Sequence, residues 1–304
     1  MRKLNYVIAD VFTDRQFGGN QLAVFTDGRD VDSETMQNIA REINYSETTF
    51  LLPSEQEGDF LLRIFTPATE LPFAGHPIVG TANVIIARRL KDWSSPQATV
   101  SFETGVGLIK VEIDTTKGEA GHTTMTQPLP KLVGTFEDKS RIAAALSLNT
   151  SDIDGRLPVE AWSNGITVLL IPVTSLGGVE KIKVDTGALE KICNEIGAKT
   201  VMAFSLETAQ PTRTAHCRVF VPLEGIPEDA ATGSANGPLG FYLVHHRLVE
   251  VAPTTKIISE QGFEMKRPSL LHIEVDSDPE TKQISAVRVG GSVVISGEGT
   301  IFLP

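Results

Sequence analysis

Two residues of this sequence have side chains suited to moving a proton and stand in unusual places. Glu47 begins an otherwise apolar segment, and His76 lies in a Gly-His turn just before an apolar helix. A poorly hydrated carboxyl group has a raised pKa and can take and return a proton near neutral pH. The N-terminal end of a helix disfavours imidazolium, so we expect His76 to be neutral. Glu47 is therefore the candidate general base and acid, and His76 a candidate relay.

Asp229 and Ser234 are further candidates, placed on either side of a second glycine turn. Each of the four residues also has a purely structural interpretation. Glu47 would be a solvated strand end, His76 a plain cap residue and Asp229 an ordinary turn acid. Ser234 would cap its helix, a role that is compatible with binding substrate. The residue types alone leave these alternatives open.

The two glycine turns are called mouth 1 (Phe73-Ala-Gly-His76) and mouth 2 (Ala231-Thr-Gly-Ser234). Each precedes an apolar helix whose first backbone N–H groups have no partner within the helix. Such a helix start is a ready anion site, because the N–H groups and the helix dipole both favour negative charge. We therefore expect a small carboxylate substrate near Gly75 and Gly233, with Thr232 among the binding residues.

The surroundings of the two mouths repeat. The segments Arg63-Ile-Phe-Thr-Pro67 and Arg218-Val-Phe-Val-Pro222 share a pattern and begin 155 residues apart, whereas Gly75 and Gly233 are 158 apart. We place the three extra residues of the second copy at Glu228-Asp-Ala230, and interpret Glu70 and Glu228 as turn surface. If the repeat is a duplication, the two mouths face each other across a cleft, where ligand sites often lie.

The elements that would hold the mouths follow from hydrophobic periodicity. The helix after mouth 1 should run to about Leu90 with Pro77 in its first turn, and the helix after mouth 2 from Leu239 to Leu248 with Pro238 near its start. Strands are expected at 4–9, 22–25, 47–52, 60–65, 99–102, 107–113, 123–126, 166–171, 201–206, 216–221, 272–275, 285–289 and 292–295. Further helices are expected after Asp32 or Ser33, at 139–146 and at 186–196. Strands outnumber helices without strict βαβ alternation, so the predicted class is α+β, with curved sheets wrapped around buried helices.

The length of 304 residues is typical of two domains. Small and charged residues at 115–121 mark a linker. We therefore predict an N-terminal domain of residues 1–118 and a C-terminal domain of residues 119–291. The last strand, within 292–304, would cross back to the first domain.

Composition excludes several classes of partner. The net charge is −11 without a basic block, which argues against nucleic-acid binding. The longest apolar run, 166–173, is too short to span a bilayer, and the first one ends at Asp10, too early for a signal peptide. Two cysteines do not make a disulfide framework, which favours the cytoplasm.

No metal or cofactor is expected. The six histidines lack ligand spacing, and neither cysteine has a CxxC partner; Cys193 and Cys217 are interpreted as small core residues. No Walker loop or Gly-x-Ser-x-Gly elbow occurs, and Gly18-Gly19 lacks the spacing of a dinucleotide fingerprint.

Taken together, several segments in order along nearly the whole chain resemble the phenazine-biosynthesis PhzF-like family, which shares the diaminopimelate-epimerase fold. The matching segments are Asp10-Val-Phe-Thr-Asp14, Phe17-Gly-Gly-Asn20, Ser46-Glu-Thr48, Arg63-Ile-Phe-Thr-Pro67, Glu70-Leu-Pro-Phe-Ala-Gly-His-Pro77, Gly80-Thr-Ala82, Asp229-Ala-Ala-Thr-Gly-Ser-Ala235, Gln261-Gly262, Arg267-Pro-Ser269 and Val289-Gly-Gly291. Two residues depart from the family pattern, Gln21 where proline is usual and Lys266 where glycine is common.

The resemblance implies two similar domains, each a curved sheet or open barrel around a central helix, with the active site between them. It also implies a homodimer and an isomerase in which the glutamate of Ser-Glu-Thr, here Glu47, moves a proton on the substrate. His76, Asp229 and Ser234 would assist, and Asn20 would contact the substrate. Backbone N–H groups near the two mouth glycines would hold a carboxylate or a developing enolate-like charge.

The mouths lack the cysteine pair that works from opposite faces in the cofactor-free epimerases of this fold. A two-thiol racemase is therefore excluded, and an isomerase with one carboxyl relay is favoured. Two rivals remain. A hydrolase or lyase would bring Asp229 and His76 into direct contact with Glu47 pointing elsewhere, and a binding protein without turnover would leave Glu47 well solvated.

Overall fold

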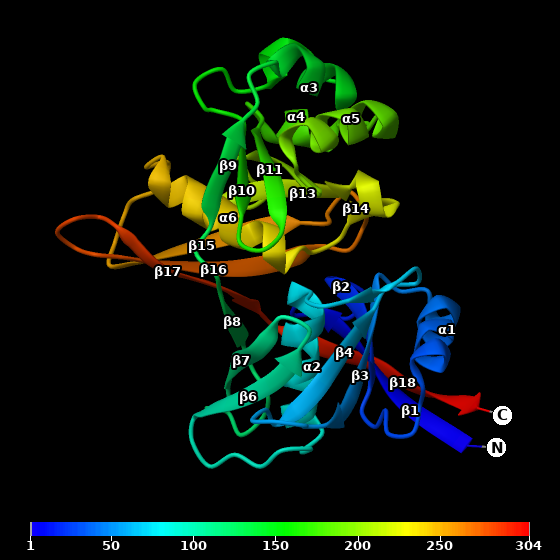
Figure 1. Ribbon diagram of the computed structural model, residues 1–304. Coiled ribbons are helices and arrows are strands. Elements are labelled where there is room, and N and C mark those ends of the chain that lie inside the picture. Colours follow the sequence, from blue (N-terminus) through cyan, green and yellow to red (C-terminus); the bar gives the residue numbers. More distant parts are fainter. Residues whose placement is uncertain (1, 304) are drawn as a thin grey trace. The chain divides into compact units, whose positions relative to one another are not determined.

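The computed structural model describes residues 2–303, which form two compact units (Figure 1). Unit 1 contains the residues up to Thr126 and those from Gly290 onward, and unit 2 is Gln127–Val289. Unit 1 draws on both ends of the chain because β18 (Val293–Leu303) pairs antiparallel with β1 (Arg2–Val11). The domain boundaries at 118/119 and 291/292 stay a prediction.

In unit 1 the strands pair in the order β18–β1–β2–β3–β4–β6–β7–β8, with the short β5 also paired to β4. The pairs β2–β3 and β4–β6 are parallel and the others antiparallel. The helix α1 (Ser33–Ile43), capped by Asp32, connects β2 to β3. The remaining strands are β2 (Asn20–Phe25), β3 (Glu47–Pro53), β4 (Phe60–Phe65), β5 (Glu70–Leu71), β6 (Gln97–Thr104), β7 (Gly107–Asp114) and β8 (Thr123–Gln127).

The helix α2 (Gly75–Ala87) is the centre of unit 1 and is buried on every side. Apolar residues cover its whole circumference, so burying it from all directions is favourable. Gly80 allows the closest approach: a Cβ there would lie 2.6 Å from Val11 and 2.7 Å from Leu22. The helix ends at Ala87, slightly before the expected position.

Unit 2 repeats this arrangement, with β11–β12 and β13–β15 as its parallel pairs. Its antiparallel pairs are β9–β10, β10–β11, β12–β13, β13–β14 and β15–β16. The strands are β9 (Lys131–Thr135), β10 (Glu160–Ser163), β11 (Thr167–Pro172), β12 (Thr200–Ser205), β13 (Ala215–Val221), β14 (Ile226–Asp229), β15 (Thr254–Gln261), β16 (Ser269–Ser277) and β17 (Ile284–Gly291). The helices α3 (Lys139–Ala145), α4 (Leu176–Glu180) and α5 (Thr186–Ile196) contribute to an apolar core against β11, β12 and β13.

The helix α6 (Gly233–His245) is the counterpart of α2 in unit 2 and begins six residues before the predicted start at Leu239. Its cap residue is Thr232, so the interpretation of Ser234 as a cap is wrong; Ser234 lies within the first turn. The glycines and the proline in this stretch have low helix propensity, and burial of the helix overrides that preference. Pro238 therefore lies inside the helix.

The α+β class, with curved sheets wrapped around buried helices, is confirmed (Figure 1). The periodicity of the sequence did not predict β5, β9, β10, β14, β15 and α4, which are short or carry charged residues that interrupt the alternation. Within residues 2–303, no helix combines the length and the apolar character needed to cross a membrane.

Candidate active site

In mouth 1 the structure brings Glu47 and His76 together. A carboxyl oxygen of Glu47 lies 3.2 Å from Nε2 of His76, and the two residues are only 9% and 5% exposed. Glu47 opens β3, and His76 is the second residue of α2. The interpretations of Glu47 as a solvated strand end and of His76 as a plain cap residue are therefore both wrong.

Asn20 and Ser46 extend this contact on the other side of the imidazole. The Asn20 amide nitrogen lies 3.3 Å from Nδ1 of His76, and the Ser46 hydroxyl donates to the Asn20 amide oxygen at 2.9 Å. The parallel pairing of β2 and β3 sets Leu22 opposite Glu47, and so brings the start of β2 beside the residues just before β3. Four polar side chains thus form one connected row at mouth 1.

The imidazole of His76 is neutral near pH 7. Burial lowers its pKa to about 3, although a hydrogen bond to the Gln21 backbone acts in the opposite direction. The expectation of a neutral histidine is confirmed, but burial rather than the helix dipole is the main cause. A neutral imidazole beside a carboxyl group can pass a proton or orient the group without adding a charge.

Mouth 2 is organised by Gln261, which lies at the end of β15 and is fully buried. Its amide oxygen accepts from the Thr232 backbone N–H and the Asn236 side chain, both at 3.1 Å. Its amide nitrogen donates to the Asp229 carbonyl at 2.8 Å and to the Thr232 hydroxyl at 2.9 Å. The Thr232 hydroxyl in turn donates to the Asp229 carboxylate. The loop from Asp229 to the start of α6 is therefore held in one conformation, with Ser234 just beyond it.

The two helix starts share a further property. Neither cap residue, Ala74 for α2 or Thr232 for α6, makes a side-chain hydrogen bond to the first-turn N–H groups. In most helices such a bond satisfies one of these donors. The donors near Gly75 and Gly233 therefore suit an anion from outside the helix.

Comparison with known proteins places the chain in a family. The family model for phenazine biosynthesis-like proteins of the PhzC-PhzF type matches residues 9–299. The chain belongs to this PhzF family. A protein from Pseudomonas fluorescens named trans-2,3-dihydro-3-hydroxyanthranilate isomerase is 36% identical over 299 residues, which cover 98% of this chain and 99% of the other. In agreement with these relatives, the chain is an isomerase.

Solved structures agree with this assignment. A PhzF-family phenazine biosynthesis protein from Bacillus anthracis matches with a TM-score of 0.90 and 27% identity over 100% of both chains. A hydroxyproline epimerase from Agrobacterium vitis matches with a TM-score of 0.68 and 13% identity, covering 99% of this chain and 92% of the other. At that identity the second likeness shows a shared fold alone. The predicted diaminopimelate-epimerase-like architecture of this PhzF-family isomerase is confirmed.

The PhzF-family repeat is aligned differently from the prediction. Ile64 pairs with Leu71 in unit 1, and Val219 pairs with Asp229 in unit 2. Ile64 and Val219 are 155 residues apart, but Leu71 and Asp229 are 158 apart. The three extra residues therefore lie before β14, where the 3₁₀ turn Pro222–Glu224 is found, and not at 228–230. In this alignment of the two copies, Asp229 of unit 2 is therefore equivalent to Leu71 of unit 1.

Glu70 and Glu228 are also more than turn surface. Glu70 accepts two hydrogen bonds from Arg63 at 2.7 and 2.6 Å, and Glu228 accepts two from Arg218 at 2.8 and 2.7 Å. We call each of these arginine–glutamate pairs a fork. The arginine and the glutamate of each fork recur in both copies of the repeat, and this recurrence was the signal available in the sequence. Such bidentate pairs fix the approach of β5 and β14 to the neighbouring strand.

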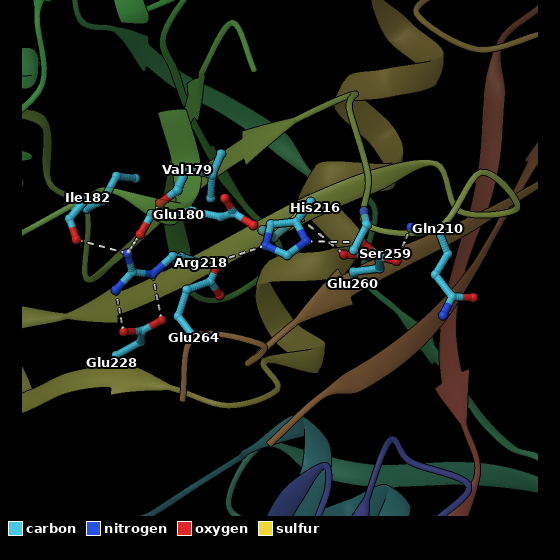
Figure 2. Close-up of polar contacts among 12 residues, drawn as sticks. Val179, Glu180, Ile182, Gln210, His216, Arg218, Glu228, Ser259, Glu260 and Glu264 are labelled. Atoms are coloured by element: carbon cyan, nitrogen blue, oxygen red, sulfur yellow. Dashed lines mark hydrogen bonds and ion pairs between the residues drawn. The ribbon is translucent and has the colours of Figure 1, made fainter. Parts of the chain in front are cut away.

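In unit 2, Figure 2 shows the imidazole of His216 between the carboxyl groups of Glu260 and Glu264. Its Nδ1 lies 3.0 Å from Glu260 and its Nε2 lies 2.9 Å from Glu264. Burial acts to lower the pKa of His216, but the hydrogen bonds to Glu264 and Glu260 outweigh it and the pKa is raised. Burial likewise acts to raise the pKa of Glu264, yet the bond from His216 leaves it lowered. This buried row of hydrogen-bonded side chains braces the segment that carries Gln261.

Both cysteines lie in the core of unit 2. Cys193 is buried in α5 and Cys217 in β13, as expected for core residues. Burial raises the pKa of the Cys193 thiol to about 11 and that of the Cys217 thiol to about 12, so both are protonated. Among the described residues, no group of three or more histidine, cysteine or acidic side chains is arranged to hold a metal ion.

Proposed function

We propose that this PhzF-family isomerase moves a proton within a small cyclic carboxylate, without a cofactor, as a trans-2,3-dihydro-3-hydroxyanthranilate isomerase does. The observation that carries the proposal is the buried contact between Glu47 and His76. The 36% identity to the Pseudomonas fluorescens isomerase over nearly the whole chain supports the substrate class.

In the proposed reaction Glu47 takes a proton from one substrate carbon, and the electron pair shifts through the conjugated system. Glu47 then returns the proton to a second carbon, so the substrate is isomerised with no oxidant, reductant or water consumed. The neutral His76 orients the carboxyl group and relays its proton. The contacts from Asn20 and Ser46 hold the imidazole in place.

Mouth 2 supplies the binding half of the proposed site. Asp229 and Ser234 orient the substrate, with Thr232 holding the Asp229 carboxylate. The first-turn N–H groups near Gly75 and Gly233 stabilise the substrate carboxylate or the enolate-like charge that develops.

The rival functions fit the described contacts less well. A hydrolase or lyase built on Asp229 and His76 requires Glu47 to point elsewhere, whereas Glu47 contacts the imidazole. A binding protein without turnover requires a well-solvated Glu47, whereas this residue is 9% exposed.

We also propose that the protein is a homodimer, as the family resemblance implies, and that it is cytoplasmic, as its two cysteines without a disulfide framework favour. Sedimentation at several protein concentrations tests the dimer directly. A monomer at all concentrations would contradict that part of the proposal without affecting the chemistry.

Deuterium wash-in tests the proposed role of Glu47. In heavy water the wild type incorporates deuterium into a dihydro-hydroxyanthranilate, measured by proton NMR. Glu47→Gln should slow incorporation and turnover by about 10²–10⁴-fold, because the amide cannot carry the proton. Glu42→Gln, which changes an exposed acid of α1, is the matched control and should behave as the wild type. Undiminished exchange in Glu47→Gln would remove Glu47 from the mechanism.

A further inference from the structure

Pro238 creates a defect in the first turns of α6. In an α-helix, the carbonyl of Ser234 would accept a hydrogen bond from the backbone N–H four residues later, at position 238. Proline has no N–H, and its ring also pushes that carbonyl away from the helix axis. The Ser234 carbonyl, which is buried with its residue, therefore needs a donor from elsewhere.

Two buried side-chain amides supply what the helix lacks. The amide nitrogen of Asn164 donates to the Ser234 carbonyl at 3.0 Å and to the amide oxygen of Gln127 at 2.8 Å. The amide nitrogen of Gln127 donates to the Gly233 carbonyl at 2.9 Å. Asn164 and Gln127 are 7% and 4% exposed. We call this pair the amide bracket.

Two further observations indicate that the bracket is built into the sequence. The backbone N–H of Ile166 points to the amide oxygen of Asn164 at 3.4 Å, which leaves its amide nitrogen facing α6. Gly237 provides the space, because a Cβ at that position would lie 2.0 Å from the amide oxygen of Gln127. The missing N–H of Pro238, the space left by Gly237 and the two side-chain amides of the bracket are therefore structurally complementary.

We propose that Asn164, supported by Gln127, is a positioning residue for the reaction. It replaces the hydrogen bond that Pro238 removes and holds the Gly233–Ser234 backbone in the orientation in which it meets the substrate. This inference rests on the proposed function in so far as Ser234 and the N–H groups of mouth 2 contact substrate. Asn164 itself acts through α6 and does not touch the reacting atoms.

The decisive test restores the missing N–H. Asn164→Ala should lower kcat/KM by about 10²-fold, mainly through kcat, since a small misplacement of a binding group has that cost. Pro238→Ala alone should change kcat/KM little. In the double variant Asn164→Ala/Pro238→Ala, the backbone N–H restored at position 238 donates to the Ser234 carbonyl, and kcat should recover most of the loss. Recovery of thermal stability without recovery of kcat, or recovery of neither, would overturn the proposal.

A control and a second readout keep this test independent of the proposed function. Asn83→Asp changes another buried asparagine that donates to a carbonyl, that of Gly121 in unit 1, and Pro238→Ala should not rescue it. Hydrogen exchange of the amides between Gly233 and Gly237 needs no turnover. It should be faster in Asn164→Ala and normal in the double variant. If the wild type leaves the dihydro-hydroxyanthranilate unchanged, the proposed function fails, but hydrogen exchange still tests the amide bracket. Hydrogen exchange in Asn164→Ala at the wild-type rate would overturn the role of the amide bracket.

Discussion

Units 1 and 2 are built alike, but the side chains around their glycine mouths differ. Both have two parallel strand pairs, a buried helix that begins at a glycine mouth, and an arginine–glutamate fork. Both also use a glutamate near the end of a strand, Glu103 or Glu260, to accept backbone N–H groups of a neighbouring loop. The donors are Glu55, Gln56 and Gly58 in unit 1, and Ala209 and Gln210 in unit 2.

The difference appears when the strands are aligned by their registers. Phe50 pairs with Arg63, and Ala203 pairs with Arg218. Counting back three residues in each strand sets Glu47 of unit 1 against a threonine, residue 200, in unit 2. The acid proposed to carry the proton therefore occurs in one copy of the scaffold. The repeat has thus preserved the framework, whereas the proposed proton transfer is confined to unit 1.

At one place in β13, unit 2 has a buried ionisable side chain where unit 1 has an apolar one. By the same alignment, His216 stands where unit 1 has Leu61, and it joins Glu260 to Glu264. Unit 2 also buries its fork more deeply: the side chains of Arg218 and Glu228 are 11% and 16% exposed, against 21% and 41% for Arg63 and Glu70. At these two places the polar contacts of unit 2 are therefore the more deeply buried.

The largest expected effect comes from breaking the two forks. Arg218 also donates to the carbonyls of Val179, Glu180 and Ile182, so Arg218→Met leaves a buried carboxylate and several acceptors without their donor. This should lower the free energy of unfolding by about 3–5 kcal/mol. Arg63→Met should cost about 1 kcal/mol or less. Urea unfolding of both variants measures the difference, and equal losses would contradict the stated asymmetry.

The second prediction compares the residues at equivalent places in the two mouths, His76 and Ser234. His76→Asn should lower kcat by about 10²-fold, because the group beside the Glu47 carboxyl no longer relays or orients. Ser234→Ala should lower kcat/KM by about tenfold, the value of one hydrogen bond. Steady-state kinetics with the dihydro-hydroxyanthranilate measure both. A larger loss for Ser234→Ala would move the main chemistry to unit 2.

The smallest effect is a pH dependence of stability that unit 2 adds. Because the pKa of His216 is raised in the folded state, this residue contributes to the free energy of unfolding. The contribution is complete below the pKa of the unfolded state, about 6.5, and is lost as the pH rises through the pKa of the folded state. The lowered pKa of Glu264 gives a contribution to the free energy of unfolding that is lost as the pH falls through the pKa of Glu264 in the folded state. Thermal unfolding of the wild type should therefore show stability falling on the alkaline side. His216→Gln, which does not titrate, should lose that fall; an unchanged profile would exclude His216 as its source.

Much of the fold was predictable because the local signals agreed with one another. The strand at 60–65 and the helix at 186–196 were predicted to the residue. The helix has Asp185 as its cap and Gly197 in the left-handed region at its end, which are the signals that define helix limits. The helix α6 was placed wrongly because its glycines and Pro238 are turn signals, and its stability comes from burial that no local pattern shows.

The residues of the candidate site could be named from the sequence, but their contacts could not be predicted from it. Glu47 and His76 were identified from their positions, yet their contact joins residues 29 apart through the pairing of β2 with β3 and the position of α2. Gln261 was noted as part of a motif without a role, and Asn164 and Gln127 were missed. Their contacts cross 25 to 106 residues of sequence, and only the folded chain brings them to mouth 2.

The central claim is that a single carboxyl group, that of Glu47, both removes and returns the proton. The direct measurement is a single turnover in ordinary water of substrate deuterated at the carbon that loses its proton. Because Glu47 is buried, we predict that part of the deuterium appears at the new carbon, and that this transfer disappears in Glu47→Gln. Deuterium transfer that persists in Glu47→Gln, or its absence from the product at the shortest times in the wild type, would contradict the claim.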